Sequence, residues 1–201
     1  MVGRNMTDKI TGPLLAIFAR WPEPGKAKTR LIPTHGAVGA AKVYRKLLEH
    51  TVTQARASGL KFELRVTGAE PKRFHEWLGD DLTVVDQGEG DLGEKLARVP
   101  APNMVIGSDA PELSGEILQQ AAAALAGEAA VIGPAEDGGY YLLGTRDPAP
   151  FAFADMEWST ETVCAETIAR FEARGITPAM LPVLADIDTG EELARYPEFR
   201  P

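Results

Sequence analysis

The sequence predicts an α/β protein in which the strands of one sheet alternate with crossover helices. Short runs with the composition of β-strands recur along the 201 residues, namely LLAIFAR, FELRV, LTVVD, MVIGS, AAVIGPA, YYLLGT and AMLPV. Between these runs lie three longer segments whose apolar residues recur at helical spacing. Strands and helices that alternate in this way are typical of a sheet with crossover connections.

Each of the three helical segments has one apolar face that would pack on the sheet. The apolar positions are Tyr44, Leu47, Leu48, Thr51, Val52 and Ala55 in the first segment, Ile117, Leu118, Ala121, Ala122 and Leu125 in the second, and Val163, Cys164, Thr167, Ile168 and Phe171 in the third. Cys164 therefore has the position of a core residue. A reactive thiol would need partial exposure and a neighbouring base.

Length and composition indicate how many domains to expect and which partners to exclude. We expect one domain over residues 13–201, preceded by a loose arm over 1–12 that has almost nothing to bury. The net charge of -8 argues against nucleic acid or an anionic membrane as a partner. No stretch reaches the roughly 18 apolar residues that span a bilayer, and a single cysteine excludes an intrachain disulfide. We therefore expect a cytoplasmic protein.

The first predicted strand continues into WPEPGKAKTRL, a turn rich in Pro and Gly that is followed by basic side chains. Pro24 and Gly25 would let a phosphate approach the backbone, and Lys28 and Arg30 would neutralise phosphoryl oxygens. The turn is not a Walker loop, because Arg20 stands where that motif has its first glycine. A solvated basic turn without function is the alternative.

A second candidate loop is QGEGDLGEK, which contains Gly88-x-Gly90-x-x-Gly93. The spacing matches a dinucleotide fingerprint, but that motif normally follows the first strand and opens a long helix, and here Pro100 ends the helical stretch early. A loop that recognises a nucleobase fits better, because Gln87 offers a donor and an acceptor and Asp91 an acceptor. A simple flexible loop is the alternative.

Carboxylates follow two further apolar runs. Ser108-Asp109 ends the strand VIGS, and Asp109 could hold Mg²⁺ or Mn²⁺ against a diphosphate, because hard cations prefer oxygen ligands. Asp188 precedes Thr189 and Glu192, which have the spacing of a capping box. Asp188 could be a second metal ligand opposite Asp109, or it could stabilise the positive helix terminus. Ordinary turn chemistry is the alternative for Asp109.

The segment GPAEDGGYYLLG places Asp137-Gly138-Gly139 between two apolar runs. Asp-Gly is typical of a hairpin turn, but Asp137 would also lie near the strand ends that present Asp109, with glycines leaving space for a ligand. Further on, Ser159 or Thr160 would cap the third helix. Trp158 would either cover the edge of the core or form one wall of an acceptor pocket.

In chain order, FARWPEPGKAKTRL, QGEGDLGEK, GSDAPEL, GPAEDGGYYLLG, the WST stretch and DIDTGEEL resemble the bacterial DUF2064 family. This family is also known as selenodomain-associated or arsenosugar-biosynthesis glycosyltransferases, within the nucleotide-diphospho-sugar transferase superfamily. The resemblance spans nearly the whole chain and extends to phospholactate guanylyltransferases and molybdenum-cofactor nucleotidyltransferases. It implies an α/β, GT-A-like single domain with a mainly parallel central sheet flanked by helices.

The resemblance also implies roles for particular residues. Asp109 matches the metal-binding aspartate of the superfamily and Asp188 its late acidic position, while Lys28 and Arg30 match the phosphate-binding loop. Residues 87–93 would face the nucleobase, and residues 137–139 the sugar or the acceptor. The expected cofactor is a divalent cation, Mg²⁺ or Mn²⁺. The expected partners are a nucleotide-sugar or a nucleoside triphosphate together with a small-molecule acceptor.

Three functions remain open from the sequence. The first is glycosyl transfer from a nucleotide-sugar, with Asp137 as the base that activates the acceptor. The second is nucleotidyl transfer, in which a phosphorylated acceptor attacks a triphosphate held by Lys28, Arg30 and the metal. The third is a nucleotide sensor without catalytic activity, although the presence of both Asp109 and Asp188 argues against it.

Overall fold

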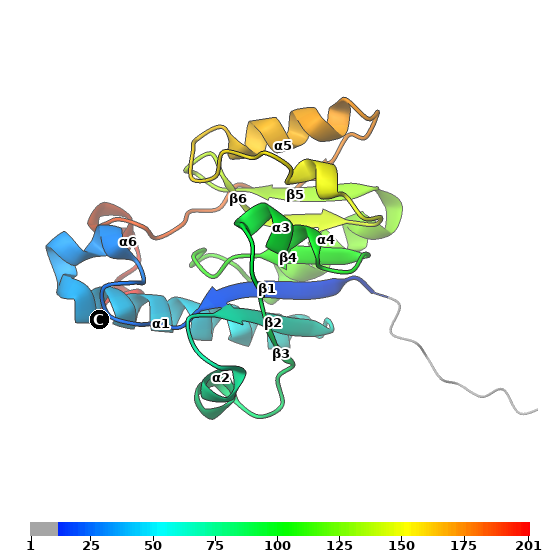
Figure 1. Cartoon of the computed structure of the whole chain (residues 1–201). Helices are drawn as coiled ribbons and strands as arrows, with labels where there is room; N and C mark the ends of the chain where they lie inside the picture. Colours follow the sequence, from blue (N-terminus) through cyan, green and yellow to red (C-terminus); the bar gives the residue numbers. More distant parts are fainter. Residues whose placement is uncertain (1–11) are drawn as a thin grey trace, which may run out of the picture.

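The computed structural model of the chain describes residues 12–201 and contains a seven-stranded sheet between two layers of helices (Figure 1). The predicted arm over residues 1–12 lies outside the described residues except for Gly12. The sheet has the order β3-β2-β1-β4-β6-β5-β7. Its strands are β1 (Leu14–Arg20), β2 (Phe62–Thr67), β3 (Val84–Asp86), β4 (Asn103–Ile106), β5 (Ala130–Pro134), β6 (Tyr140–Thr145) and β7 (Ala179–Met180).

The sheet is mainly parallel, as predicted. Strand β1 pairs in parallel with both β2 and β4, and β5 pairs in parallel with β7. Only β6 runs against its neighbours β4 and β5. Because the chain builds the sheet outward from β1 in both directions, the carboxyl ends of β1 and β4 form a topological switch point, which is where open α/β sheets bind ligands.

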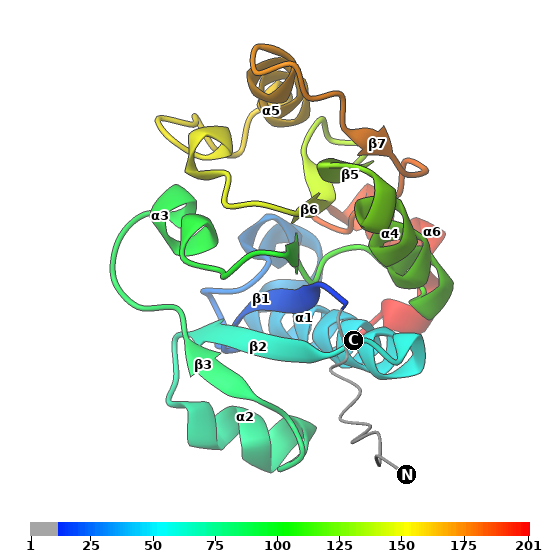
Figure 2. The same ribbon diagram turned by 90° about the vertical axis from the view of Figure 1, so that its right-hand side faces the viewer.

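Helices cover both faces of the sheet (Figure 2). One face carries α1, α2 and α4, and the other carries α3, α5 and the short η2, while α6 and η3 pack against the first half of α1. The bounds are η1 (Thr29–Leu31), α1 (Ile32–Ser58), α2 (Pro71–Leu78), α3 (Leu92–Ala97), α4 (Gly115–Gly127), η2 (Pro150–Ala152), α5 (Val163–Glu172), α6 (Gly190–Arg195) and η3 (Pro197–Phe199).

The cores on the two faces follow from the alternation of side chains along the strands. In β1, Leu15 and Ile17 contact the α1 and α4 side, and Ala16 contacts the α3 and α5 side. The predicted apolar faces of the helices lie in these cores, Leu48 of α1 and Leu118 of α4 among them. The assignment of Cys164 to the core is confirmed, because it is buried with Phe171 on the inner face of α5.

Two predicted helix starts have different outcomes. The capping box before α6 is confirmed. The side chain of Thr189 accepts a hydrogen bond from the backbone amide of Glu192, and the Glu192 carboxylate accepts one from the amide of Thr189. The start predicted at Ser159 or Thr160 is wrong, because α5 begins at Val163 and its first turn has no side-chain cap. The hydroxyl of Thr160 instead donates to the carbonyl of Glu157, and Ser159 adopts a left-handed φ of 65°, so residues 157–162 form a separate turn.

Candidate functional site

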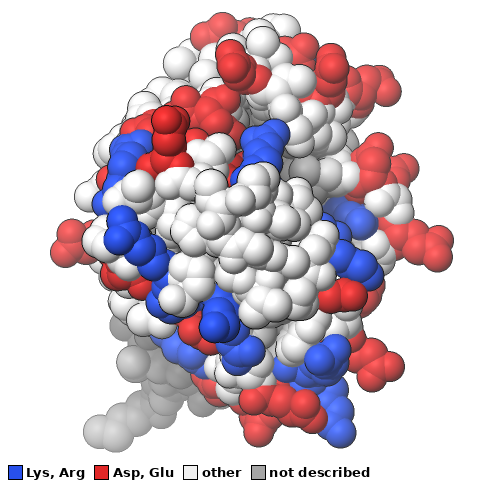
Figure 3. All heavy atoms as spheres, turned by 90° about the vertical axis from the view of Figure 1, so that its left-hand side faces the viewer, with Lys and Arg blue, Asp and Glu red and all other residues white. Residues whose placement is uncertain are grey.

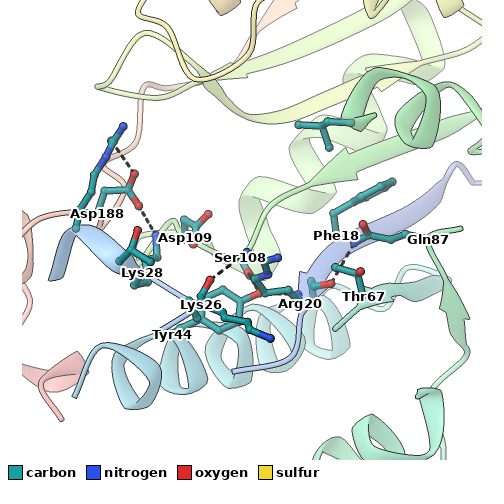
Figure 4. A pocket seen from close by; sticks show the side chains of 15 residues that line it. Phe18, Arg20, Lys26, Lys28, Tyr44, Thr67, Gln87, Ser108, Asp109 and Asp188 are labelled. Atoms are coloured by element: carbon teal, nitrogen blue, oxygen red, sulfur yellow. Dashed lines mark hydrogen bonds and ion pairs between the residues drawn. The ribbon is translucent and has the colours of Figure 1, made fainter. Parts of the chain in front are cut away.

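A cavity of about 370 Å³, here called the charged cavity, opens at the carboxyl ends of β1 and β4 (Figure 4). Its lining is formed by Phe18, Ala19, Arg20, Lys26, Ala27, Lys28, Thr29, Arg30, Tyr44, Thr67, Gln87, Leu92, Ser108, Asp109 and Asp188. In Figure 4, Lys28, Asp109 and Asp188 lie at one end, and Phe18, Thr67 and Gln87 lie at the other. The cavity is therefore elongated between an ionic end and an end with an aromatic ring and an amide.

The ionic end is organised around a lysine that bridges the two predicted metal ligands. The ammonium nitrogen of Lys28 lies 2.7 Å from Oδ1 of Asp109 and 2.6 Å from Oδ1 of Asp188. The guanidinium of Arg30 lies 3.2 Å from the other oxygen of Asp188. The structure thus brings together four residues that the sequence singled out, and it places a cation between the carboxylates.

Backbone contacts explain how these residues meet across more than 150 positions of sequence. Lys28 precedes η1 with a left-handed φ of 49°, an uncommon conformation for a residue other than glycine. The amide of Ile187 donates to the carbonyl of Asp109 at 3.0 Å, which holds the segment before α6 against the end of β4. The backbone amide of Asp188 donates to the carboxylate of Glu192 at 2.7 Å. The capping contacts at the start of α6 therefore also hold the backbone of Asp188 in place.

The charge on Lys28 is stable in this setting. Burial of its side chain, which is 5% exposed, opposes the charged form, but the attraction of Asp109 and Asp188 outweighs that effect and raises the pKa of Lys28. Oδ1 of Asp109 is itself buried, and it forms an ion pair of 2.7 Å with the Lys28 ammonium. A ligand that reaches this oxygen must therefore compete with the lysine.

Tyr44 is a cavity residue that the sequence did not reveal, because it lies in the apolar stripe of α1. Its hydroxyl accepts a bond from the amide of Arg20 at 2.9 Å and one from the hydroxyl of Ser108 at 3.1 Å. Burial, and then the nearby charge of Asp109, raises the pKa of Tyr44. Ser108, predicted as a ligand-binding residue, thus connects α1 to the end of β4 beside the cavity.

Gln87 lies at the other end of the charged cavity, as predicted for a residue that faces a nucleobase. Its amide nitrogen donates to the carbonyls of Ala19 at 3.1 Å and Arg65 at 2.9 Å, so both amide hydrogens are used within the protein. Only its carbonyl oxygen remains for a ligand. The donor that the sequence suggested for base recognition therefore serves to connect β1, β2 and the loop after β3.

The remaining residues of the second loop have local roles in the structure. The Asp91 carboxylate accepts a hydrogen bond from the backbone amide of Glu94 at 2.8 Å, and the Glu94 carboxylate accepts one from the amide of Asp91. The pair forms a capping box for α3. Gly93 packs so closely that an added Cβ would lie 2.7 Å from the carbonyl oxygen of Phe153. Neither residue lines the charged cavity, and nor does Gly90, which is exposed in the turn. Pro24 and Gly25 are likewise exposed and outside its lining.

A second cavity of about 330 Å³, here called the aromatic cavity, adjoins the first. The two share Phe18, Leu92 and Asp109. The other lining residues of the aromatic cavity are Leu96, Val105, Ile106, Gly107, Asp137, Gly139, Tyr140, Tyr141, Trp158, Ser159, Thr160 and Val163. The predicted residues Asp137, Gly139 and Trp158 thus lie together beside Asp109.

Asp137 lies in the turn between β5 and β6, so the hairpin interpretation of Asp-Gly is correct. Its Oδ1 accepts a bond from the amide of Gly139 at 2.8 Å. A smaller space of about 160 Å³ lies between Asp109, Asp137, Asp188 and Asp186, a carboxylate that the sequence did not single out although it stands two residues before Asp188. Burial, followed by the charges of Asp137 and Asp188, raises the pKa of Asp186 to about 6.

Figure 3 shows the face on which the strand β1 ends. Basic and acidic side chains are interspersed there, and the Lys and Arg residues do not merge into one continuous patch. A basic surface of the kind that binds nucleic acid is thus missing from this face. Within residues 12–201, no helix has both the length and the apolar character needed to cross a membrane.

The sequence matches, over residues 50–160, the family described as "Uncharacterized protein conserved in bacteria (DUF2064)". The chain belongs to this family. No protein with a curated function matches it significantly.

Solved structures relate this family member to enzymes that use nucleotides. A crystal structure of a candidate nucleotide-diphospho-sugar transferase from Desulfovibrio desulfuricans G20 superposes with a TM-score of 0.84 and 29% identity, covering 90% of this chain and 84% of the other. Rv0371c from Mycobacterium tuberculosis H37Rv, in a complex with manganese, gives 0.57 and 17%, with coverage of 92% and 98%. The 4-diphosphocytidyl-2C-methyl-D-erythritol synthase of Anaerococcus prevotii DSM 20548 gives 0.55 and 12%, with coverage of 93% and 98%. The last two likenesses show a shared fold.

Proposed function

We propose that this protein is a metal-dependent glycosyltransferase that uses a nucleotide-diphospho-sugar as donor. The observation that carries the proposal is the Lys28 ammonium between Asp109 and Asp188, at the switch point of the sheet and at one end of an elongated cavity. A nucleotide has a similar polarity, with a charged diphosphate at one end and a flat base at the other. The similarity to the Desulfovibrio protein supports the same class of substrate.

The diphosphate would lie at the ionic end. Lys28 is buried and charged, and Arg30 stands at the mouth with its side chain 65% exposed. Two cations of this kind neutralise the negative charge that develops on the leaving diphosphate when the bond to the sugar breaks. At the other end, the ring of Phe18 and the carbonyl oxygen of Gln87 would contact the base.

The donor groups of this site fit Mg²⁺ or Mn²⁺. Asp109 and Asp188 offer hard oxygen ligands, and both carboxylates already hold a cation, the Lys28 ammonium, between them. Within residues 12–201, no three acidic, histidine or cysteine side chains converge closely enough to hold an ion by themselves. Such ions are commonly bound through one or two carboxylates together with substrate phosphates, and a bound ion here would neutralise the diphosphate.

Asp137 would act as the general base. Its second carboxylate oxygen accepts no hydrogen bond from the described residues, and the side chain lines the aromatic cavity beside Asp109. The acceptor oxygen would form a bond to the anomeric carbon while the bond from that carbon to the diphosphate breaks. The proton of the acceptor hydroxyl would pass to Asp137, and the nucleoside diphosphate would leave with the bonding electrons.

Nucleotidyl transfer is the second candidate, and one observation favours it. Four cations, namely Arg20, Lys26, Lys28 and Arg30, line the charged cavity, which is enough positive charge for a triphosphate. In that reaction a phosphorylated acceptor would attack the α-phosphate and release pyrophosphate.

Calorimetry with nucleoside diphosphates, triphosphates and nucleotide-sugars, each with and without Mn²⁺, tests the proposal. We expect the tightest metal-dependent binding for a nucleotide-sugar, followed by its slow hydrolysis to sugar and nucleoside diphosphate. A clear preference for a triphosphate, with pyrophosphate release on addition of sugar phosphates, would establish nucleotidyl transfer instead. Binding without turnover of any donor would support a sensor, and no binding at all would overturn each of these functions.

A further inference from the structure

The aromatic cavity adjoins the charged cavity but has a different chemical character. The two share Phe18, Leu92 and Asp109, so they meet at these side chains. Leu92 is 41% exposed, which is unusual for a large apolar side chain and places it at the boundary between the two spaces. A ligand of the aromatic cavity would therefore lie beside Asp109, where the proposed donor has its diphosphate.

Four aromatic side chains, those of Phe18, Tyr140, Tyr141 and Trp158, line the aromatic cavity. Aromatic faces bind flat apolar rings and the apolar faces of sugar rings through large contact areas. Asp137 and Ser159 lie on the same lining and offer a carboxylate acceptor and a hydroxyl donor. The lining thus combines stacking surfaces with groups that bind hydroxyls.

The charge of this lining excludes one class of acceptor. Among residues 12–201, no lysine or arginine lines the aromatic cavity, whereas two carboxylates, Asp109 and Asp137, do. Only the charge of Asp109 is balanced locally, by Lys28. A phosphate group on the acceptor would therefore meet a negative charge without a compensating cation, and like charges placed together at an interface are strongly unfavourable.

Backbone contacts join the two turns that form the wall of the cavity. The amide of Cys164 donates to the carbonyl of Gly138 at 2.9 Å, which joins the start of α5 to the hairpin turn. Gly138 has a φ of 86°, and a Cβ atom there would overlap the backbone of Glu161. These contacts fix the turn that carries Trp158 against the turn that carries Asp137.

We infer that the aromatic cavity is the acceptor site and that it takes an uncharged, ring-bearing alcohol in preference to the phosphorylated form of the same compound. The role as acceptor site rests on the proposed transfer reaction. The preference for the uncharged compound follows from the residues of the cavity and does not depend on that reaction. It also bears on the choice between the two transfer reactions, because nucleotidyl transfer needs a phosphorylated acceptor.

Phenyl β-D-glucoside and its 6-phosphate are suitable probes, since they differ only in the phosphate. Their binding to the full-length protein is measured by calorimetry and by quenching of tryptophan fluorescence, without a nucleotide. We expect the neutral glucoside to bind at least about tenfold more tightly, equivalent to about 1.4 kcal/mol. Equal affinities, tighter binding of the 6-phosphate, or no binding of the glucoside at millimolar concentration would overturn the inference.

Two variants locate the binding. Trp158→Leu should weaken binding of the glucoside severalfold, whereas Trp77→Leu, a change of the same type in the aromatic cluster with Trp21 and Phe74, should leave it unchanged. Thr160→Lys adds a cation to the cavity and should reverse the preference toward the 6-phosphate. Equal effects of the two tryptophan changes, or an unaltered preference in Thr160→Lys, would place the probe elsewhere and contradict the inference.

A separate titration with nucleotide-sugars and Mn²⁺ keeps the two proposals distinguishable. If that titration fails while the glucoside still binds at Trp158, the proposed reaction is wrong and the ligand class of the cavity stands. If nucleotide-sugars bind but the glucoside does not, the inference about the acceptor is wrong and the donor site stands.

Discussion

The two loops that stood out in the sequence have opposite roles in the structure. Residues 24–30 follow β1 and place Lys28 between Asp109 and Asp188 in the charged cavity. Residues 87–93 follow β3 and have more glycines, yet Asp91 and Gly93 serve the start of α3 and its packing. The comparison teaches that a buried charge after the first strand predicted the lining of this cavity better than glycine spacing did.

The largest expected effect comes from Lys28→Met in the first loop. Loss of the ammonium should weaken nucleoside diphosphate binding roughly 100-fold, because a charge-assisted hydrogen bond contributes about 1.5–3 kcal/mol. The same change removes the cation between Asp109 and Asp188, so Mn²⁺ alone should bind more tightly than in the wild type. Calorimetry with each ligand measures both effects.

Lys72→Met is the matched control for this change. Lys72 lies in α2, outside the lining of the charged cavity, and its side chain is 81% exposed, so its loss should leave both affinities at the wild-type value. If Lys28→Met weakens Mn²⁺ binding as well, then the lysine does not compete with a metal for the two carboxylates.

Asp109→Asn should have the next largest effect. Wild-type affinity for a nucleoside diphosphate should rise on addition of Mn²⁺, by about tenfold if the ion connects the carboxylate to the phosphates. In the variant this gain should disappear, while binding without metal persists. A titration series with and without Mn²⁺ measures the ratio, and an unchanged ratio would remove Asp109 from the metal site.

Gln87→Leu tests the first residue of the second loop. The change leaves the carbonyls of Ala19 and Arg65 without their donor, so the free energy of unfolding should fall by about 1–2 kcal/mol. Nucleotide affinity should fall only severalfold, because just the carbonyl oxygen faces a ligand. Urea unfolding and calorimetry measure the two quantities, and a loss of affinity with unaltered stability would restore Gln87 as mainly a base-recognition residue.

Asp91→Ala should have the smallest effect on function. The change removes the cap of α3 and should lower the free energy of unfolding by about 1 kcal/mol. Affinity for nucleotides should stay at the wild-type value, since Asp91 does not line the charged cavity. A clear loss of affinity in this variant, measured by the same calorimetric titration, would reassign the second loop to the ligand.

The difference between the loops also indicates what the sequence can predict. The α/β fold, the sheet and the three helix faces follow from local periodicity, and Asp109 was correctly placed at the end of a strand. The contact between Lys28 and Asp188 joins residues 160 positions apart, and such a contact depends on the packing of α6 against α1. No local pattern encodes it.

The outcome of other predictions depended on which partners a single side chain hydrogen-bonds. Asp91 and Glu94 have the same capping spacing as Thr189 and Glu192, so this role could have been found from the sequence. The hydrogen bonds of Gln87 could not, because their acceptors lie on two other strands of the sheet. The sequence did not identify Tyr44 as a cavity residue, because residues that line a cavity and residues of the core follow the same spacing on an amphipathic helix.

In the proposed metal site, the bridge made by Lys28 would affect which ions the two carboxylates bind. Copper and zinc bind most protein oxygen and nitrogen ligands more tightly than magnesium or manganese do. Asp109 and Asp188 should bind free copper or zinc weakly, because the metal ion would first have to displace the Lys28 ammonium, which lies 2.6–2.7 Å from both carboxylates. In the proposed reaction, a donor whose phosphates attract the lysine, and which brings its own ion, would overcome this protection.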